Sequence, residues 1–179
     1  MQPPTRCLVS STSPVFISWI FQDLELGFYF GLIYDEVVEN KKIVLVGGCF
    51  DILHYGHIHF LKKAKLLGNH LVVAIESDQN VKKLKGKERP IHNQNQRREI
   101  LESLSFVDEV IILKNVMADK DYLDLVQKVR PLVIAVTTGD SMIEKKIDHA
   151  KTVGAKVIEI ENTEVPSTTK IAKLIKLEK

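Results

Sequence analysis

The feature that most constrains the fold is an apolar run that leads directly into two glycines and then two histidines. Ile43–Val46 is an apolar, largely β-branched run typical of a buried strand, and residues 47–57 continue as Gly-Gly-Cys-Phe-Asp-Ile-Leu-His-Tyr-Gly-His. The glycines permit a sharp turn and a close backbone approach to a ligand. His54 and His57 lie three apart at a predicted helix start, so they share one face of its first turn. Because helix starts attract anions and imidazoles donate hydrogen bonds to phosphoryl oxygens, the segment predicts a polyphosphate site.

From residue 41 onward the sequence alternates between apolar runs and amphipathic patterns. The predicted strands are 43–46, 71–76, 109–113, 132–136 and 156–160, and the predicted helices are 57–67, 94–103, 121–129, 141–153 and 167–177. Buried strands separated by amphipathic helices indicate an α/β fold, a doubly wound five-stranded parallel sheet of the Rossmann-like type. Ligands of such folds bind at the carboxyl ends of the strands. The polar segments 137–140 and 161–169 follow the fourth and fifth predicted strands, as this rule requires.

Residues 1–40 differ in character from the remainder and are predicted to be an N-terminal extension to a domain at 41–179. Residues 15–33 are rich in Phe, Trp, Ile and Leu, which raises the question of a membrane segment. Asp23 and Glu25 fall in its middle, where each would cost about 2.5–3.5 kcal/mol in a bilayer. We therefore expect no membrane partner. The extension is expected to pack on the domain, to contact another chain or to be poorly ordered, or it reflects an early start codon.

Composition narrows the class of protein. At 179 residues, with 45% hydrophobic residues, the chain is long enough for one domain with a substantial core. A net charge of +2 argues against a general nucleic-acid binder, so no nucleic-acid partner is expected. The only two cysteines, Cys7 and Cys49, are far apart, which favours a reducing cytoplasm over a disulfide framework. We expect a cytoplasmic protein.

Two further segments carry groups suited to phosphate. Residues 82–98 hold four lysines and three arginines against Glu88, a local charge of +6. This cluster suggests a mobile loop at 82–89 that closes over a triphosphate, and the alternative is a solvated surface loop. Ser167, Thr168 and Thr169 open the last predicted helix, where hydroxyls and free N–H groups hold phosphate oxygens or simply cap the helix.

The chain lacks a P-loop and a Gly-x-Gly-x-x-Gly fingerprint. Instead it resembles the cytidylyltransferase-like nucleotidyltransferase superfamily over residues 41–175. The resemblance rests on the motif Gly-x-Phe-Asp-x-x-His-x-Gly-His, found here as Gly48, Phe50, Asp51, His54, Gly56 and His57. A zinc site at the two histidines is a rival interpretation, but apart from Asp51 no third ligand is evident in the sequence.

Different segments resemble different members of the superfamily. Residues 48–54, 77–78, 84–86 and 89–90 look closest to heptose 1-phosphate adenylyltransferases, whereas 162–169 is similar to glycerol-3-phosphate cytidylyltransferases. Archaeal-type FAD synthases, which are FMN adenylyltransferases, share residues 50–54 and 96–99. The chain departs from the family at Asn162, where an arginine is expected, and at 137–140. These positions help to choose base and acceptor, so the substrate stays open.

The resemblance implies an enzyme that moves AMP or CMP from ATP or CTP to a small phosphomonoester and releases pyrophosphate. It implies Mg²⁺ carried by the triphosphate, a homodimer and two sets of site residues. The catalytic set is His54, His57, Lys85 and Arg97. The nucleotide-binding set is Gly47, Gly48, Cys49, Phe50, Asp51, Gly56, Arg89, Gly139, Asp140, Ser167, Thr168 and Thr169. Arg98 is expected to face solvent or form a salt bridge. The competing class is a non-catalytic nucleotide-binding module.

Overall fold

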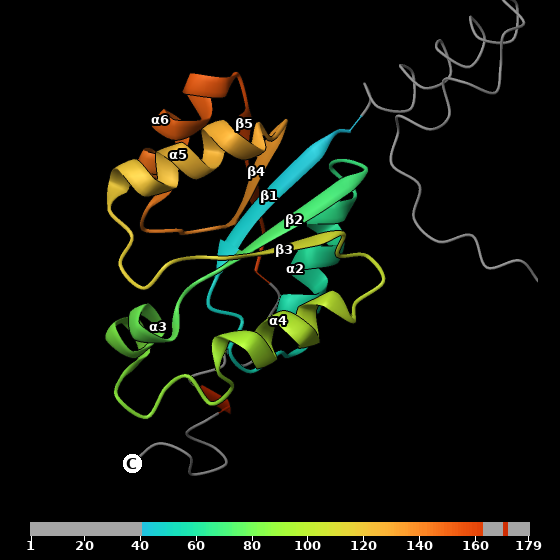
Figure 1. The fold of residues 1–179 in the computed structure, drawn as a ribbon. Coiled ribbons are helices and arrows are strands. Elements are labelled where there is room, and N and C mark those ends of the chain that lie inside the picture. Colours follow the sequence, from blue (N-terminus) through green and yellow to red (C-terminus); the bar gives the residue numbers. More distant parts are fainter. Residues whose placement is uncertain (1–40, 163–169, 172–179) are drawn as a thin grey trace, which may run out of the picture. The chain divides into compact units, whose positions relative to one another are not determined.

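The computed structural model describes residues 41–162 and 170–171, all within the unit Lys41–Lys179 (Figure 1). Its five parallel strands form a sheet in the order β3-β2-β1-β4-β5. The strands are β1 (Ile43–Gly48), β2 (His70–Ile75), β3 (Glu109–Ile112), β4 (Val133–Thr137) and β5 (Lys156–Ile160). The predicted five-stranded parallel α/β fold is confirmed. The N-terminal extension predicted at 1–40 lies outside the described residues.

Helices cover both faces of the sheet (Figure 1). They are α2 (Tyr55–Lys65), α3 (Asp78–Lys85), α4 (Gln94–Glu102), α5 (Asp119–Val129) and α6 (Ile143–Val153). Four of these were expected within a few residues, and α3 was not. Lys170 and Ile171 are helical, and the rest of the helix expected at 167–177 lies outside the described residues. No helix in the described ranges is long and apolar enough to cross a membrane.

The strands bury alternate residues against two hydrophobic clusters. Val44 and Val46 of β1 face a cluster that includes Leu61 of α2 and residues of α4. Leu45 faces the opposite cluster, which includes Val126 of α5 and residues of α6. Because side chains alternate along a strand, a nearly continuous apolar run is what a sheet covered on both faces requires.

The central strand β1 lies between β2 and β4, with which it pairs in parallel. The chain runs outward from β1 in one direction through β2 and β3 and in the other through β4 and β5. This reversal is the switch point of a doubly wound sheet, where the loops after two neighbouring strands separate and leave a crevice. The glycine-histidine segment follows β1, so the topology delivers it to that crevice.

Helix α2 offers a direct test of this packing. Leu61 is fully buried, whereas Leu66 at the end of the same helix is 84% exposed. Leu61→Ala should lower the free energy of unfolding by about 2–5 kcal/mol, because the cavity it leaves lies in the core. Leu66→Ala should change it by less than about 0.5 kcal/mol. Urea denaturation of both variants measures this, and equal losses would contradict the orientation of α2.

Candidate functional site

A pocket of about 520 Å³ opens at the carboxyl ends of β1, β4 and β5. We call it the motif pocket. It brings together most of the residues selected from the sequence, which are Gly47, Gly48, Cys49, Phe50, Asp51, His54, Gly56, His57, Lys85, Arg89 and Asp140. Phe60, Val136, Thr137, Lys146, Glu161 and Asn162 complete its lining. The pocket therefore lies at the sheet edge where the strand-end rule places a ligand.

The turn after β1 is tightly built. Phe50 is buried and has φ of 44°, a left-handed conformation that is uncommon for a bulky side chain. A Cβ at Gly48 would lie 2.9 Å from Cε2 of the Phe50 ring, so glycine is required there for the turn to close. The neighbouring Cys49 is half-buried, and burial raises the pKa of its thiol. Cys49 therefore lines the pocket as a neutral thiol.

Asp51 anchors the segment before α4 to this turn. Its carboxylate accepts hydrogen bonds from Arg89 Nε at 2.5 Å and from the backbone N–H groups of Ile91 and His92 at 2.8 and 3.1 Å. Asp51 is 2% exposed and Arg89 is 1% exposed. A buried ion pair is tolerated only when further hydrogen bonds satisfy it, as they do here. These contacts let Asp51 orient the segment that leads into α4.

The two motif histidines stand side by side at the start of α2. Their ring centroids are 4.1 Å apart. His54 is the N-cap, and its Nδ1 accepts a hydrogen bond from the N–H of Gly56 at 3.0 Å. The neutral ring therefore carries its proton on Nε2, which stays available as a donor. The ring centroid of Phe50 lies 5.3 Å from that of His57, so the two rings are in contact.

His57 is held as a neutral imidazole. Burial, followed by the adjacent His54, lowers its pKa from 6.5 to about 4, although the Ile52 carbonyl opposes this shift. Burial also lowers the pKa of His54. Within the described residues, the buried Nδ1 of His57 has no hydrogen-bond partner of normal geometry. Both rings therefore meet an incoming anion as neutral N–H donors.

The basic segment differs from the mobile loop predicted for residues 82–89. Lys82 and Lys85 lie in the last turn of α3, which Ser77 caps at its start and Gly86, with φ of 107°, ends. Of the lysines in this segment, Lys85 lines the motif pocket. Helix α3 was missed because it buries only Val81 and so lacks an apolar stripe.

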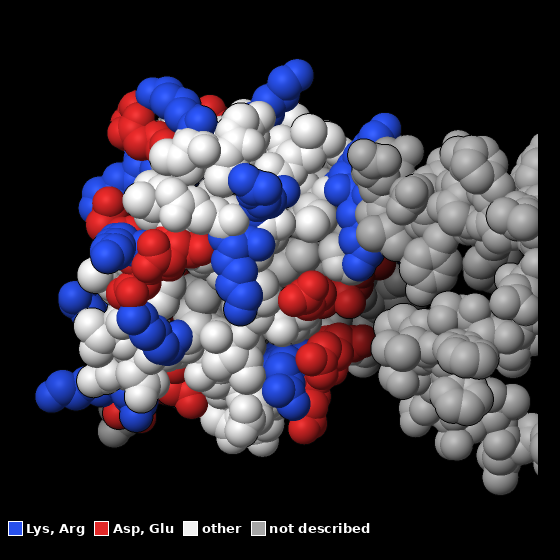
Figure 2. Space-filling view, turned by 45° about the horizontal axis from the view of Figure 1, so that its top comes forward, with Lys and Arg blue, Asp and Glu red and all other residues white. Residues whose placement is uncertain are grey.

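The arginines of this segment are paired internally, which reduces the positive charge available to a ligand. Arg89 pairs with Asp51, Arg97 with Asp78 and Arg98 with Glu102. The contact to Glu102 spans 3.5 Å on the surface, and it confirms the salt bridge expected for Arg98. On the face that Figure 2 shows, basic and acidic side chains are interspersed.

Arg97, which the resemblance places in the catalytic set, is fully buried and does not line the motif pocket. Its guanidinium donates to four oxygens, namely Cys49 O at 2.5 Å, Glu76 O at 2.7 Å, Asp78 Oδ1 at 2.8 Å and His92 O at 3.1 Å. With its donors engaged in this way, it joins the ends of β1 and β2 to the starts of α3 and α4. The geometry assigns it to positioning these segments rather than to direct phosphate contact.

The turn after β4 supplies a second ion pair. Burial would raise the pKa of Asp140, but hydrogen bonds from Lys146 Nζ at 2.6 Å and the Met142 N–H at 2.8 Å hold it below its usual value. Gly139 has φ of 80° and forms the turn without lining the pocket. Lys146 was missed from the sequence because it lies on α6, where only the fold brings it to the pocket.

A second pocket of about 390 Å³ lies beside the first, and we call it the apolar pocket. Leu45, Leu84, Leu125 and other aliphatic side chains from β1, β2, β4, α3 and α5 form most of its wall. Its polar side chains are Glu76, Asn80, Asp119, Tyr122, Lys145, Lys146 and His149. Gly47, Gly48, Cys49 and Lys146 line both pockets. The two pockets therefore meet at the end of β1.

Two features discussed from the sequence are the helix start at residues 167–169 and the rival zinc site. Ser167, Thr168 and Thr169 lie outside the described residues. In the described part of the chain, no three His, Cys, Asp or Glu side chains are grouped so that they could hold a metal ion.

Comparison with known proteins points to the same superfamily as the sequence motif. The family model described as cytidylyltransferase-like matches residues 45–174. Bifunctional protein HldE from Campylobacter concisus is 41% identical over 142 residues, or 76% of this chain and 28% of that protein. HldE from Geobacter sulfurreducens is 34% identical over 81% of this chain and 29% of its own length. The chain thus spans less than a third of these relatives.

Two solved structures share the fold. A lipopolysaccharide core biosynthesis protein from Thermoplasma volcanium matches with a TM-score of 0.56 and 28% identity, over 70% of this chain and 98% of that chain. Pantoate-beta-alanine ligase from Francisella tularensis matches with a TM-score of 0.55 at 20% identity, over 76% of this chain and 65% of that chain. The second similarity concerns the fold alone.

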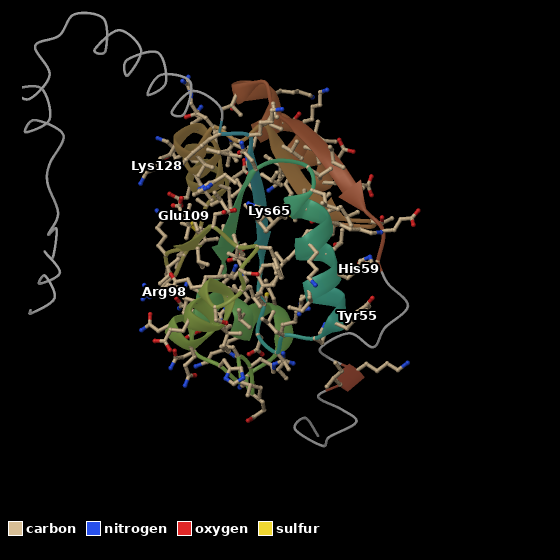
Figure 3. The ribbon with its side chains drawn as sticks, turned by 90° about the vertical axis from the view of Figure 1, so that its right-hand side faces the viewer. Tyr55, His59, Lys65, Arg98, Glu109 and Lys128 are labelled. Carbon is tan, nitrogen blue, oxygen red and sulfur yellow. The ribbon has the colours of Figure 1, made fainter. Side chains whose placement is uncertain are left out.

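The low pKa of His57 has a consequence for stability. As pH falls from about 6.5 to about 4, the unfolded chain binds a proton at His57 that the folded chain does not, so stability decreases in that window. His57→Gln should remove this component, which amounts to about 2–3 kcal/mol at the acid end. Urea denaturation across pH 4–7 measures it. His59→Gln is the control, because His59 lies on α2 beside Tyr55 and lines neither pocket (Figure 3). Equal pH dependence in wild type and His57→Gln would contradict the assignment.

Adjacent arginines test the role of Arg97. Arg97→Lys keeps the charge but loses the planar fork that reaches several carbonyls, so it should cost at least about 2 kcal/mol of stability. Arg98→Lys alters an exposed pair and should cost less than about 0.5 kcal/mol. Urea denaturation of the two variants separates them, and an Arg97→Lys protein of wild-type stability would refute the positioning role.

Proposed function

The chain belongs to the cytidylyltransferase-like family, and from this premise we propose that it transfers a nucleotidyl group from a nucleoside triphosphate to a phosphomonoester with release of pyrophosphate. The observation that carries the proposal is the pair of adjoining pockets. One pocket is lined by imidazoles and cations and suits a polyphosphate, and the other is largely aliphatic and suits an organic body. They meet at Gly47, Gly48, Cys49 and Lys146. At this junction the acceptor phosphate, from the apolar pocket, would meet the α-phosphate of the triphosphate, from the motif pocket.

In the proposed reaction the acceptor phosphate attacks the α-phosphorus directly. A phosphomonoester has a second pKa near ~6, so at pH 7 it is mostly a dianion and needs no general base. An acceptor oxygen forms the new bond to the α-phosphorus, and the bond from that phosphorus to the bridging oxygen of the β-phosphate breaks. Pyrophosphate leaves with the electron pair. Catalysis then consists of in-line positioning and stabilisation of charge on the transferring group.

The site residues take their proposed roles from their positions. His54 and His57 donate N–H groups to the α-phosphoryl oxygens, and their neutral state lets them do so without holding a buried charge before substrate arrives. Lys85, which lines the motif pocket, contacts the β- or γ-phosphate. Ser167, Thr168 and Thr169 are proposed to hold the same phosphates. Mg²⁺ is proposed to enter with the triphosphate, because Mg²⁺ is commonly bound through substrate phosphates.

For the substrates we propose transfer of AMP from ATP to a sugar 1-phosphate of the heptose type. Three observations support this choice. The motif at 48–54 looks closest to heptose 1-phosphate adenylyltransferases. The relatives at 41% and 34% identity are named HldE. The structural neighbour at 28% identity is titled a lipopolysaccharide core biosynthesis protein.

A pyrophosphate-release screen with magnesium tests the proposal. It crosses ATP and CTP against heptose 1-phosphate, glycerol 3-phosphate and FMN. We expect release with ATP and heptose 1-phosphate. Release with FMN instead would favour the FAD synthase alternative, and no release with any pair would favour a nucleotide-binding module.

Substitution at the histidine pair gives a quantitative prediction. His57→Ala should lower kcat by a factor of roughly 10² or more, because a donor to the transferring phosphoryl group is lost. His59→Ala, two residues further along α2 and outside both pockets, should leave kcat within about twofold. Pyrophosphate release under saturating substrates measures both variants, and a fully active His57→Ala protein would refute the proposed role.

A further inference from the structure

The proposed function leaves unexplained a carboxylate in the apolar pocket. Glu76 follows β2 directly, and its backbone is fixed on both sides. Its N–H donates to the Gly48 carbonyl at 3.0 Å, and its own carbonyl accepts from Arg97 at 2.7 Å. The side chain lines the apolar pocket and not the motif pocket. The backbone contacts that build the end of β1 therefore also determine where this carboxylate lies.

Neutral donors hold the Glu76 carboxylate. Tyr122 Oη donates to Oε1 at 3.0 Å, and Asn80 Nδ2 donates to Oε2 at 2.6 Å. In the described part of the chain, Glu76 has no ion-pair partner. Burial, together with the adjacent Glu76 carboxylate, raises the pKa of Tyr122, so its hydroxyl remains a donor at physiological pH. The carboxylate is thus oriented without being neutralised.

The other carboxylate of this pocket is in a different state. Asp119 lies 3.4 Å from Lys145 and 3.5 Å from His149, so its charge is partly compensated. Lys146 at the junction of the pockets pairs with Asp140 at 2.6 Å. Among the described residues, Glu76 is therefore the carboxylate of the apolar pocket that has no cationic partner, and part of its accepting capacity remains open. A carboxylate has about four lone-pair sites, and Tyr122 and Asn80 occupy two of them.

We infer that Glu76, oriented by Tyr122 and Asn80, determines acceptor specificity by accepting hydrogen bonds from hydroxyl groups on the body of a sugar phosphate. This inference rests on the proposed function, in which the acceptor phosphate lies at the junction of the two pockets. Its hydroxylated body then extends into the apolar pocket, where aliphatic walls contact its C–H faces. A carboxylate with accepting capacity selects bodies that carry donors, because a body without them leaves a desolvated charge unsatisfied.

Glu76→Gln is the central variant, since it keeps size and shape while removing the charge. With ATP and heptose 1-phosphate it should raise KM for the sugar phosphate about 10-fold or more, because hydrogen bonds to charged groups are worth about 1.5–3 kcal/mol. KM for ATP should stay within about twofold. Tyr122→Phe should raise KM for the sugar phosphate by a smaller factor. The matched control is Asp124→Asn. It removes an exposed carboxylate that lies on α5, the helix of Tyr122, but outside both pockets.

Deoxygenated acceptors separate recognition from a structural effect. A series of sugar 1-phosphates, each lacking one hydroxyl group, should contain a member that wild type uses with about 10-fold higher KM. For Glu76→Gln that same deletion should cost little, because its partner has already been lost. Equal penalties for every deletion in both proteins would overturn the inference.

Binding without turnover keeps the inference separate from the proposed function. Calorimetric titration with heptose 1-phosphate alone compares wild type, Glu76→Gln and Tyr122→Phe. Wild-type binding that weakens about 10-fold in Glu76→Gln supports the inference even if no pyrophosphate is ever released. Absence of binding to wild type, or equal binding to both proteins, overturns it. If Glu76→Gln fails to fold, Tyr122→Phe carries the same comparison with a smaller expected change.

Discussion

The buried guanidinium of Arg97 is the constraint on which the rest of the site depends. A charge removed from water is tolerated only where hydrogen bonds and an opposite charge replace its hydration. Arg97 meets this requirement with carbonyls of Cys49, Glu76 and His92 and with the carboxylate of Asp78. The same contacts bring the ends of β1 and β2 against the starts of α3 and α4. The contacts that satisfy this one charge thus position Cys49, which lines both pockets, and Glu76, which lines the apolar pocket.

Asp51 and Arg89 repeat this principle on the other side of the turn. Because Asp51 accepts from Arg89 and from two backbone N–H groups, the segment before α4 is fixed to the motif. The charges of these arginines are already paired within the protein. The donors that the motif pocket offers to a ligand are therefore chiefly the imidazoles of His54 and His57 and the ammonium group of Lys85. Neutral imidazoles suit this role. They cost little in the absence of ligand and provide donors when negative charge arrives.

The sequence predicted the sheet, the strand ends and the histidine pair because each follows from a local pattern. Apolar runs identify strands, and two histidines three apart share a helix face wherever that helix lies. The role of Arg97 could not be predicted in this way, since its partner Cys49 is 48 residues distant. Helix α3 was missed because eight residues with a single buried position are too few to establish a helical repeat. Glu76 and Tyr122 are 46 residues apart, and only the parallel topology brings them together.

The two glycines after Val46 are required for different reasons. At Gly48 a Cβ would strike the Phe50 ring, so packing alone demands glycine. At Gly47 the Ala74 carbonyl oxygen, at 4.0 Å, is the only described atom within 4 Å of such a Cβ, so the fold would accept a side chain there. Gly47 nevertheless lines both pockets. A side chain at Gly47 would narrow the junction where, in the proposed reaction, the acceptor oxygen reaches the α-phosphorus. In this interpretation, the reacting phosphates, and not the packing of the protein, require glycine at that position.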